Sequence, residues 1–108
     1  FHLQIAVDMP GEAQQLAYHS ALNKAAGILR ACAHPLRLRL LSLIHLHKSI
    51  NVNSIYSELN LEQSVASQHL KILRDANLVI TRRTGKFIFY SVSYEQLSLI
   101  NSCLHKYF

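Results

Sequence analysis

The feature that most constrains the fold of this chain is a change of hydrophobic period near Leu78. Before it, apolar residues recur at the spacing of an amphipathic helix, as in Leu22, Ala25, Ala26, Leu29 and Cys32. After it, "LVITRR" and "FIFYSV" are rich in β-branched and aromatic residues, and the glycine-containing segment "TGK" (84–86) separates them. The pattern predicts a run of helices followed by a β-hairpin, and a last apolar stripe predicts one further helix.

Capping residues set the expected element boundaries. Pro35 suits the first turn of a helix, Asn51 can cap one, and Asn77 can adopt the left-handed conformation that closes one. We therefore predict helices at about 11–33, 35–48, 52–59 and 62–76, a hairpin over 78–92 and a last helix over 94–107. The second helix is apolar around most of its circumference, which predicts that it is the most buried. These elements make one mainly α-helical domain, residues 1–108, with a small β-hairpin.

Charge indicates the class of partner. The formal net charge is +5, and residues 62–86 hold five cations against two carboxylates, a net charge of +3. A localised basic stretch of this kind is what binding to a phosphate backbone requires. No apolar run approaches the roughly 18 residues that span a bilayer, no signal peptide is visible, and the two cysteines do not suggest a secreted disulfide framework. We expect a cytoplasmic protein with no membrane partner.

Two short helices joined by a tight turn at Asn60-Leu61, and followed directly by a basic hairpin, describe a winged helix-turn-helix. Within "QSVASQHLKIL" (63–73), Ala66, Leu70 and Leu73 fall at i, i+4 and i+7 and fasten the helix to the domain. A helix fits the major groove of DNA, where short polar side chains can reach base edges. The residues left on the free side of this helix are of that kind: Gln63, Ser64, Ser67, Gln68 and Lys71.

Three segments, "ACAHPLRLRLL", "SVASQHLKILRDANLV" and "RRTGKFIFYSV", resemble the ArsR/SmtB family of bacterial winged-helix transcriptional regulators over roughly residues 31–92. The resemblance implies a homodimer that pairs through its first and last helices and binds a two-fold symmetric operator in double-stranded DNA. Most such proteins repress transcription until a metal ion or a redox signal weakens DNA binding. It also implies that the same five polar residues form the recognition surface and that Arg82, Arg83, Gly85 and Lys86 form the wing. One departure is Glu62, which stands where a capping Ser is common.

Some conspicuous residues have a second interpretation. His69 is expected to pack and hydrogen-bond inside the helix-turn-helix rather than to touch DNA, and Tyr90 to hold the wing to the body. Arg37 and Arg39 either contact phosphates or form ion pairs, and the sequence leaves both readings open.

The metal sites of the family are not recognisable here. Its motif "ELCVCDL" on the third helix aligns with "SINVNSI" (49–55), which contains no Cys, Asp or Glu. On the last helix, Tyr94 and Gln96 stand where an Asp-x-His pair is expected, and Tyr107 where a later His is expected. We therefore predict no metal or other cofactor.

The remaining histidines form no familiar metal-binding pattern. His45 and His47 lie two residues apart, so they point to different helix faces. The other candidates for a shared site are His2, His19, His34 and His105, and their spacing matches no known motif. Scattered surface histidines are the simpler interpretation.

Cys32 and Cys103 raise a redox alternative, because the first and last helices should pack together. A disulfide needs Cα atoms within about 7 Å, which the sequence does not establish. Redox-sensing relatives place one thiol where this chain has Ser42 and a second one beyond its last residue. We expect two buried cysteines without a redox role.

Two function classes remain at this stage. The favoured one is a dimeric, sequence-specific DNA-binding regulator that acts as a repressor. The alternative is a winged-helix module that binds protein or RNA, although such modules often lose the polar helix face or the basic wing. No Ser-His-Asp, Cys-His, phosphate-loop or paired-carboxylate signature is present, so no enzymatic activity is expected.

Overall fold

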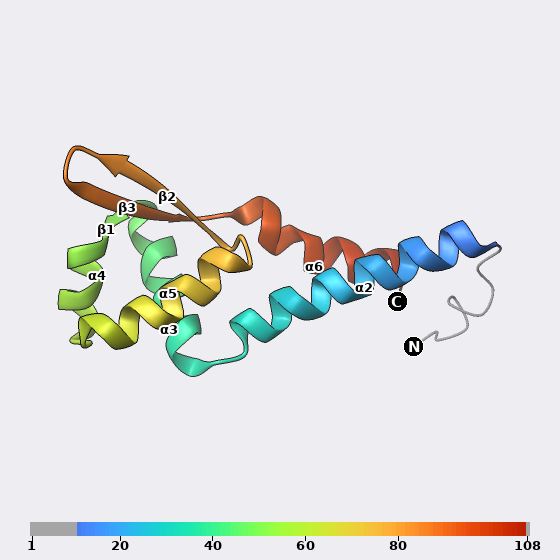
Figure 1. The fold of residues 1–108 in the computed structure, drawn as a ribbon, viewed down its shortest axis with the longest axis horizontal. Helices are drawn as coiled ribbons and strands as arrows, with labels where there is room; N and C mark the ends of the chain where they lie inside the picture. The colour runs from blue at the N-terminus through green and yellow to red at the C-terminus, as the bar shows by residue number, and fades with distance from the viewer. Residues whose placement is uncertain (1–10, 108) are drawn as a thin grey trace.

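Eight helices and strands follow one another in residues 11–107, the part of the chain that the computed structural model describes (Figure 1). They are α2 (Glu12–Cys32), α3 (Pro35–His47), β1 (Ile50–Asn51), α4 (Val52–Leu59), α5 (Gln63–Asp75), β2 (Val79–Thr84), β3 (Phe87–Val92) and α6 (Tyr94–Tyr107). The order confirms the predicted mainly α-helical winged-helix fold, and every predicted helix end agrees to within one residue. Residues 1–10 and 108 of the predicted domain, His2 among them, lie outside the described residues.

The predicted hairpin is part of a three-stranded antiparallel sheet in the order β1-β3-β2. β2 and β3 pair from Val79↔Val92 to Thr84↔Phe87, and the two residues between the strands begin with Gly85 at a φ of +62°. The third strand, β1, was not predicted. It contributes only two residues, Ile50 and Asn51, opposite Tyr90 and Phe89, and so short a segment carries no detectable period.

Side-chain and backbone caps mark the starts and ends of the helices at the positions that the sequence suggested. The His34 imidazole accepts a hydrogen bond from the Leu36 N–H ahead of α3, and the Asn51 side chain accepts one from the Asn53 N–H ahead of α4. Asn77 has a φ of +59°, which confirms its predicted left-handed conformation. The Leu78 N–H then donates to the Leu73 carbonyl, so α5 ends in a Schellman motif that leads directly into β2.

Helix α3 lies at the centre of the winged-helix body, in contact with α2, α4, α5 and β3. Leu40 and Ile44 are completely buried, and they join a core that includes Ile55 of α4 and Leu70 of α5. Leu38 and Leu46 of α3 are nevertheless exposed, although the helix is apolar around most of its circumference. Four neighbours cover only part of a helix, and apolar composition alone does not reveal which part.

Helices α2 and α6 run antiparallel beside each other and extend away from the winged-helix body, which gives the described chain an elongated shape of 52 × 27 × 22 Å (Figure 1). A second small apolar cluster holds them together, made of Tyr18 and Ala25 from α2 and Cys103 from α6. The two ends of the molecule therefore carry separate cores.

Candidate nucleic-acid interface

Helix α5 divides into a buried face and a free face. Ala66, Leu70 and Leu73 are buried, as their spacing predicted. All of the polar residues predicted to read DNA are exposed on the rest of the helix surface: Gln63, Ser64, Ser67, Gln68 and Lys71. The helix therefore presents a continuous polar surface of the kind that can enter a major groove.

The predicted recognition residues are not equally free. The Ser67 hydroxyl lies 3.1 Å from the phenolic oxygen of Tyr56 on α4, and the two groups share a hydrogen bond. Tyr56 was not among the predicted site residues, yet its hydroxyl is joined to Ser67 on the exposed polar face of α5. An amphipathic aromatic residue near the end of the preceding helix was the available signal.

Lys71 is also engaged. Its ammonium nitrogen lies 2.7 Å from a carboxylate oxygen of Asp75, one turn further along α5, and both side chains are 65% exposed. Asp75 was not among the predicted site residues, although its i, i+4 spacing from Lys71 was readable in the sequence. The pair reduces the positive charge that α5 offers to a phosphate.

The wing separates its two arginines. Arg82 is opposite Phe89 and Arg83 is opposite Ile88, so the strand alternation places these neighbours on opposite faces of the hairpin. Arg83 shares a face with Tyr90, which is buried against the helices, while Arg82 shares a face with the exposed Ile80. At the turn, the Lys86 ammonium lies 5.6 Å from the centre of the Phe87 ring. All three cations are exposed, but they do not form one cluster.

Tyr90 is buried in the main core and holds the wing to the helical body, as predicted. Burial raises the pKa of its phenol, and Arg74 of α5 partly offsets that shift through its charge and a hydrogen bond. Arg74 is thus a structural member of the basic stretch.

His69 and Arg37 interact away from the exposed polar face of α5 and hold that helix in place. The Arg37 guanidinium donates to the Ala31 carbonyl through Nε at 2.6 Å, and Nη2 donates to the Arg30 carbonyl at 3.3 Å. Its Nη1 lies 3.2 Å from Nδ1 of His69, whose ring lies 4.5 Å from that of His34. Arg37 therefore neither pairs with a carboxylate among residues 11–107 nor points freely to DNA; it joins the end of α2 to α5.

The protonation state of His69 follows from this contact. A guanidinium only donates hydrogen bonds, so Nδ1 must accept and the ring is neutral. Burial lowers the pKa of His69, and the neighbouring His34 and Arg37 lower it further. The structural role predicted for His69 is confirmed. Arg39 is exposed and forms no ion pair or hydrogen bond with another described residue, so its phosphate-contact reading stays a prediction.

The histidines of α3 point to different partners. His45 Nδ1 lies 2.7 Å from the Tyr94 hydroxyl, whereas His47 Nε2 lies 3.0 Å from a Glu58 carboxylate oxygen. Within residues 11–107, no three His, Cys, Asp or Glu side chains come together in a way that could hold a metal ion. His2, which was named with His19, His34 and His105 as a candidate for a shared metal site, falls outside that range.

The cysteines lie in different parts of the molecule. Cys103 is buried, and its sulfur lies 4.0 Å from the carbonyl oxygen of Ala21 on α2. Cys32 is eleven residues further along α2 than Ala21. That distance corresponds to roughly 16 Å of helix, well beyond the Cα separation of a disulfide. Both thiols are free, and burial raises the pKa of Cys32, with Arg37 opposing that shift. A disulfide within one chain is incompatible with this geometry.

One face of the α2–α6 pair is apolar and uncovered. Leu29 and Leu104 are 51% and 50% exposed. They border a groove of about 300 Å³ whose lining is otherwise apolar: Leu22, Ala25, Ala26, Ile100 and Cys103. No helix within residues 11–107 has the length and apolarity needed to cross a membrane.

Known proteins share both the sequence pattern and this fold. Residues 34–81, from the α3 cap into β2, match the family described as bacterial regulatory protein, arsR family. The transcriptional activator HlyU of Vibrio cholerae is 35% identical over 97 residues, which are 90% of this chain and 87% of that protein. The transcriptional repressor PagR of Bacillus anthracis is 36% identical over 75 residues, 69% of this chain and 75% of that protein.

A solved structure of HlyU from Vibrio cholerae superimposes with a TM-score of 0.64 at 38% identity, covering 78% of this chain and 90% of that one. Both relatives are transcriptional regulators with a DNA-binding helix-turn-helix, and neither is an enzyme. The alignment with HlyU covers 90% of this chain, so the similarity is not confined to the matched segment 34–81. The chain therefore belongs to the arsR family of bacterial transcriptional regulators.

Proposed function

We propose that this regulator is a homodimeric repressor that binds a two-fold symmetric DNA operator without a bound metal or other cofactor. One observation supports this most strongly: α5 exposes all five predicted recognition side chains, and the wing exposes Arg82, Arg83 and Lys86. It acts in the cytoplasm, where bacterial DNA is found.

The uncovered apolar face of α2 and α6 supports dimerisation. A second copy related by a two-fold axis brings the same leucines together from both sides, which removes them from water and makes an isologous interface. The two α5 helices then meet two half-sites of an operator with matching symmetry.

The side chains of the interface divide between sequence reading and backbone binding. Gln68 can make a bidentate contact with adenine, and Ser64 can bond to a base or a phosphate. Lys86, together with whichever of Arg82 and Arg83 lies on the side of the wing that faces DNA, holds the phosphate backbone. These contacts give affinity with little sequence preference. Ser67 acts together with Tyr56, since their hydroxyls are already paired.

Repression is the simpler sign of regulation for such a dimer. Occupying an operator that overlaps a promoter blocks polymerase without any further activating surface. PagR is named a repressor and HlyU an activator, so relatives of both signs exist. A promoter fusion measured with and without the protein decides the sign directly: repression predicts higher reporter output in its absence.

The decisive experiment is selection of bound sites from fragmented genomic DNA, followed by gel-shift titration of the enriched duplex. We expect a palindromic site and an affinity that falls steeply with salt. Failure to enrich any duplex would favour the alternative, a winged-helix module that binds RNA or protein.

Two alanine variants then test the assignment of roles on that duplex. Gln68→Ala should relax base preference at one position per half-site, by about 1–3 kcal/mol of discrimination. Lys86→Ala should weaken binding to all sequences about equally and lower the salt slope by about one for each protomer. If both variants bind like the parent protein, neither α5 nor the wing is the DNA-binding surface.

A further inference from the structure

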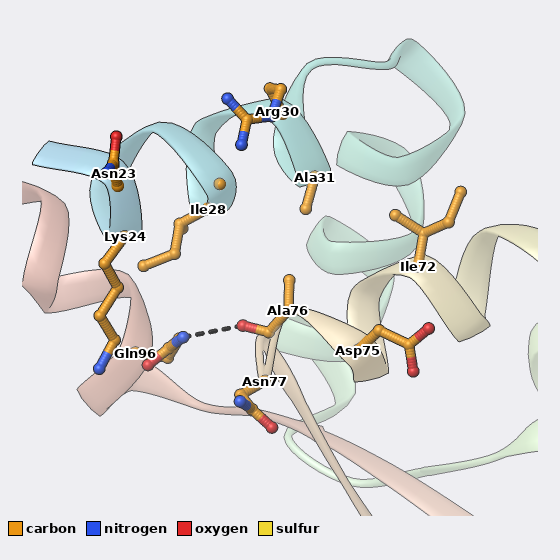
Figure 2. Close-up of a pocket in the computed structure, with 11 residues that line it drawn as sticks. Asn23, Lys24, Ile28, Arg30, Ala31, Ile72, Asp75, Ala76, Asn77 and Gln96 are labelled. Atoms are coloured by element: carbon orange, nitrogen blue, oxygen red, sulfur yellow. Dashed lines mark hydrogen bonds between the residues drawn. The ribbon is translucent and has the colours of Figure 1, made fainter. Parts of the chain in front are cut away.

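A shallow cleft of about 560 Å³, open to solvent and called the cavity below, lies between the C-terminal half of α2, the end of α5 and the start of α6 (Figure 2). Its apolar floor is formed by Ile28 and Ala31 of α2 with Ile72 and Ala76 of α5. The volume lies within the range of small-molecule sites, and an apolar floor with a few polar groups around it is their usual composition.

Two uncompensated cations border this cavity. Lys24 and Arg30 extend from α2 at separate places around it, with Ile28 between them (Figure 2). Neither side chain forms an ion pair or hydrogen bond with another residue of the described range 11–107. The carboxylate at the cavity, Asp75, is already paired with Lys71 at 2.7 Å. The cavity therefore offers positive charge next to an apolar surface.

The amide side chains around the cavity are partly fixed. Gln96 of α6 donates from Nε2 to the Ala76 carbonyl at 2.8 Å, which ties the start of α6 to the end of α5 (Figure 2). Asn23 and Asn77 complete the polar rim. These groups can orient a polar ligand, since amides both donate and accept hydrogen bonds.

Gly27 gives an independent indication that the space is kept open. It lies in the middle of α2 and lines the cavity, although glycine is about 1 kcal/mol less favourable than alanine inside a helix. Packing does not require it: a Cβ at this position would meet only the Arg30 Nη2 atom, at an ordinary 3.8 Å. A larger side chain here would project into the cavity.

The cavity does not compete with the proposed dimer interface. Gly27 and Ala31 of its lining lie on the opposite side of α2 from Leu22 and Leu29 of the apolar groove, because each residue turns the helix by about 100°. A ligand can therefore occupy it in the dimer.

We propose that this cavity binds a small amphipathic monocarboxylate, with its apolar body on Ile28 and Ile72 and its carboxylate held by Lys24 or Arg30. The cavity joins the recognition helix to both helices of the proposed dimer interface, so its occupant regulates DNA binding. An added negative charge should weaken the attraction to DNA phosphates. This regulatory part rests on the proposed function, whereas the binding site itself does not.

The test is ligand-observed NMR on the whole protein with a panel of short and medium-chain aliphatic and phenyl-substituted monocarboxylates, each beside its primary amide. Members of the panel should bind at submillimolar concentration, and each amide should bind about tenfold more weakly, since it lacks the charge-assisted hydrogen bond. Absence of binding up to millimolar concentration, or equal binding of acid and amide, overturns the proposal.

Three variants locate the site. Lys24→Met with Arg30→Met should remove the preference for the acid, and Gly27→Met should abolish binding while the more favourable helix residue preserves folding. Arg39→Met, which removes an exposed cation from α3 outside the cavity, is the matched control and should bind normally. Unchanged binding in the first two proteins would place any ligand elsewhere and refute the site.

The regulatory part is measured by titrating the best acid with and without saturating operator. The acid should bind several-fold more weakly to the DNA complex, because coupling between two sites is reciprocal. Equal affinities would refute regulation while leaving the cavity as a binding site. If no operator exists, the NMR result still stands, so the two proposals fail separately.

Discussion

At the scale of single residues, charge pairing within α5 sets how strongly the helix can attract DNA. Lys71 faces outward, as a phosphate-binding residue should, but its ammonium group is paired with Asp75. The pair is exposed, so it contributes little to folding, and its main consequence is electrostatic.

Asp75→Asn should therefore strengthen DNA binding several-fold at low salt and change the stability of the free protein by less than about 1 kcal/mol. Gel-shift titrations at two salt concentrations measure the first effect and urea unfolding the second. Glu12→Gln, which removes an equal charge at the far end of α2, is the control and should bind DNA like the parent. A gain of the same size in both variants would mean that only net charge matters.

His69 gives the protein a pH dependence whose sign can be worked out. Its folded-state pKa lies below the ordinary value of 6.5, because burial, His34 and Arg37 all disfavour the charged ring. As pH falls below about 6.5, the unfolded chain takes up a proton that the folded chain refuses. The contribution of His69 to the free energy of unfolding should be fully present above about pH 6.5 and should decrease as the pH falls toward the folded-state pKa.

Urea midpoints measured between neutral and mildly acidic pH test this dependence. His69→Gln should be less stable than the parent at neutral pH but should show a flatter decline with acid. His105→Gln, at an exposed position on α6, should retain the parental slope. Parallel curves for the parent and His69→Gln would mean that other groups control the acid sensitivity.

At the scale of secondary-structure elements, the recognition helix is capped well at one end only. Its C-terminus closes through Asn77 and a Schellman motif, whereas Glu62 at the N-cap forms no side-chain hydrogen bond. Glutamate is too long for the usual N-cap contact, although its charge still favours the positive end of the helix dipole.

Glu62→Asp should shorten that side chain, keep its charge and stabilise the protein by about 0.5–1 kcal/mol. The matched control Glu62→Gln removes the charge without adding a cap and should lose a few tenths of a kcal/mol. Urea unfolding at neutral pH distinguishes them. A destabilised Asp variant would show that the start of α5 is held by other contacts.

At the scale of the whole molecule, the exposed leucines on one side of α2 and α6 are the surface that a second copy should cover. Leu16 provides an internal comparison. It is 68% exposed on α2, but the helix turn places it well away from the side that carries Leu29.

Leu29→Glu should convert the proposed dimer to a monomer at micromolar concentration. Operator binding should then weaken by more than tenfold, because one half-site is lost. Leu16→Glu should remain dimeric and bind normally. Sedimentation velocity and gel shifts measure both. Dissociation by the Leu16 variant, or a dimeric Leu29→Glu protein, would move the interface away from the apolar groove.

Much of the fold, and the exposure of the candidate DNA-binding residues, was predictable from local pattern. Spacing of apolar residues, caps such as Asn51 and the change of period at Leu78 are properties of neighbouring residues, so they defined every helix within one residue and the exposed face of α5. The support role of His69 was also predicted, because its motif places it beside the buried side of that helix.

Only the tertiary structure decided what depends on contacts between distant segments. The pairing of β1 with β3, the Arg37–His69 contact across 32 residues, and the cavity between α2, α5 and α6 have no local periodicity. Arg82 and Arg83 point in opposite directions because of the strand register. Cys32 and Cys103 are far apart because of the offset at which α2 and α6 pack against each other. Local sequence determines which element forms and which face is apolar; packing determines which parts of those faces meet and which remain open to DNA, a second copy or a ligand.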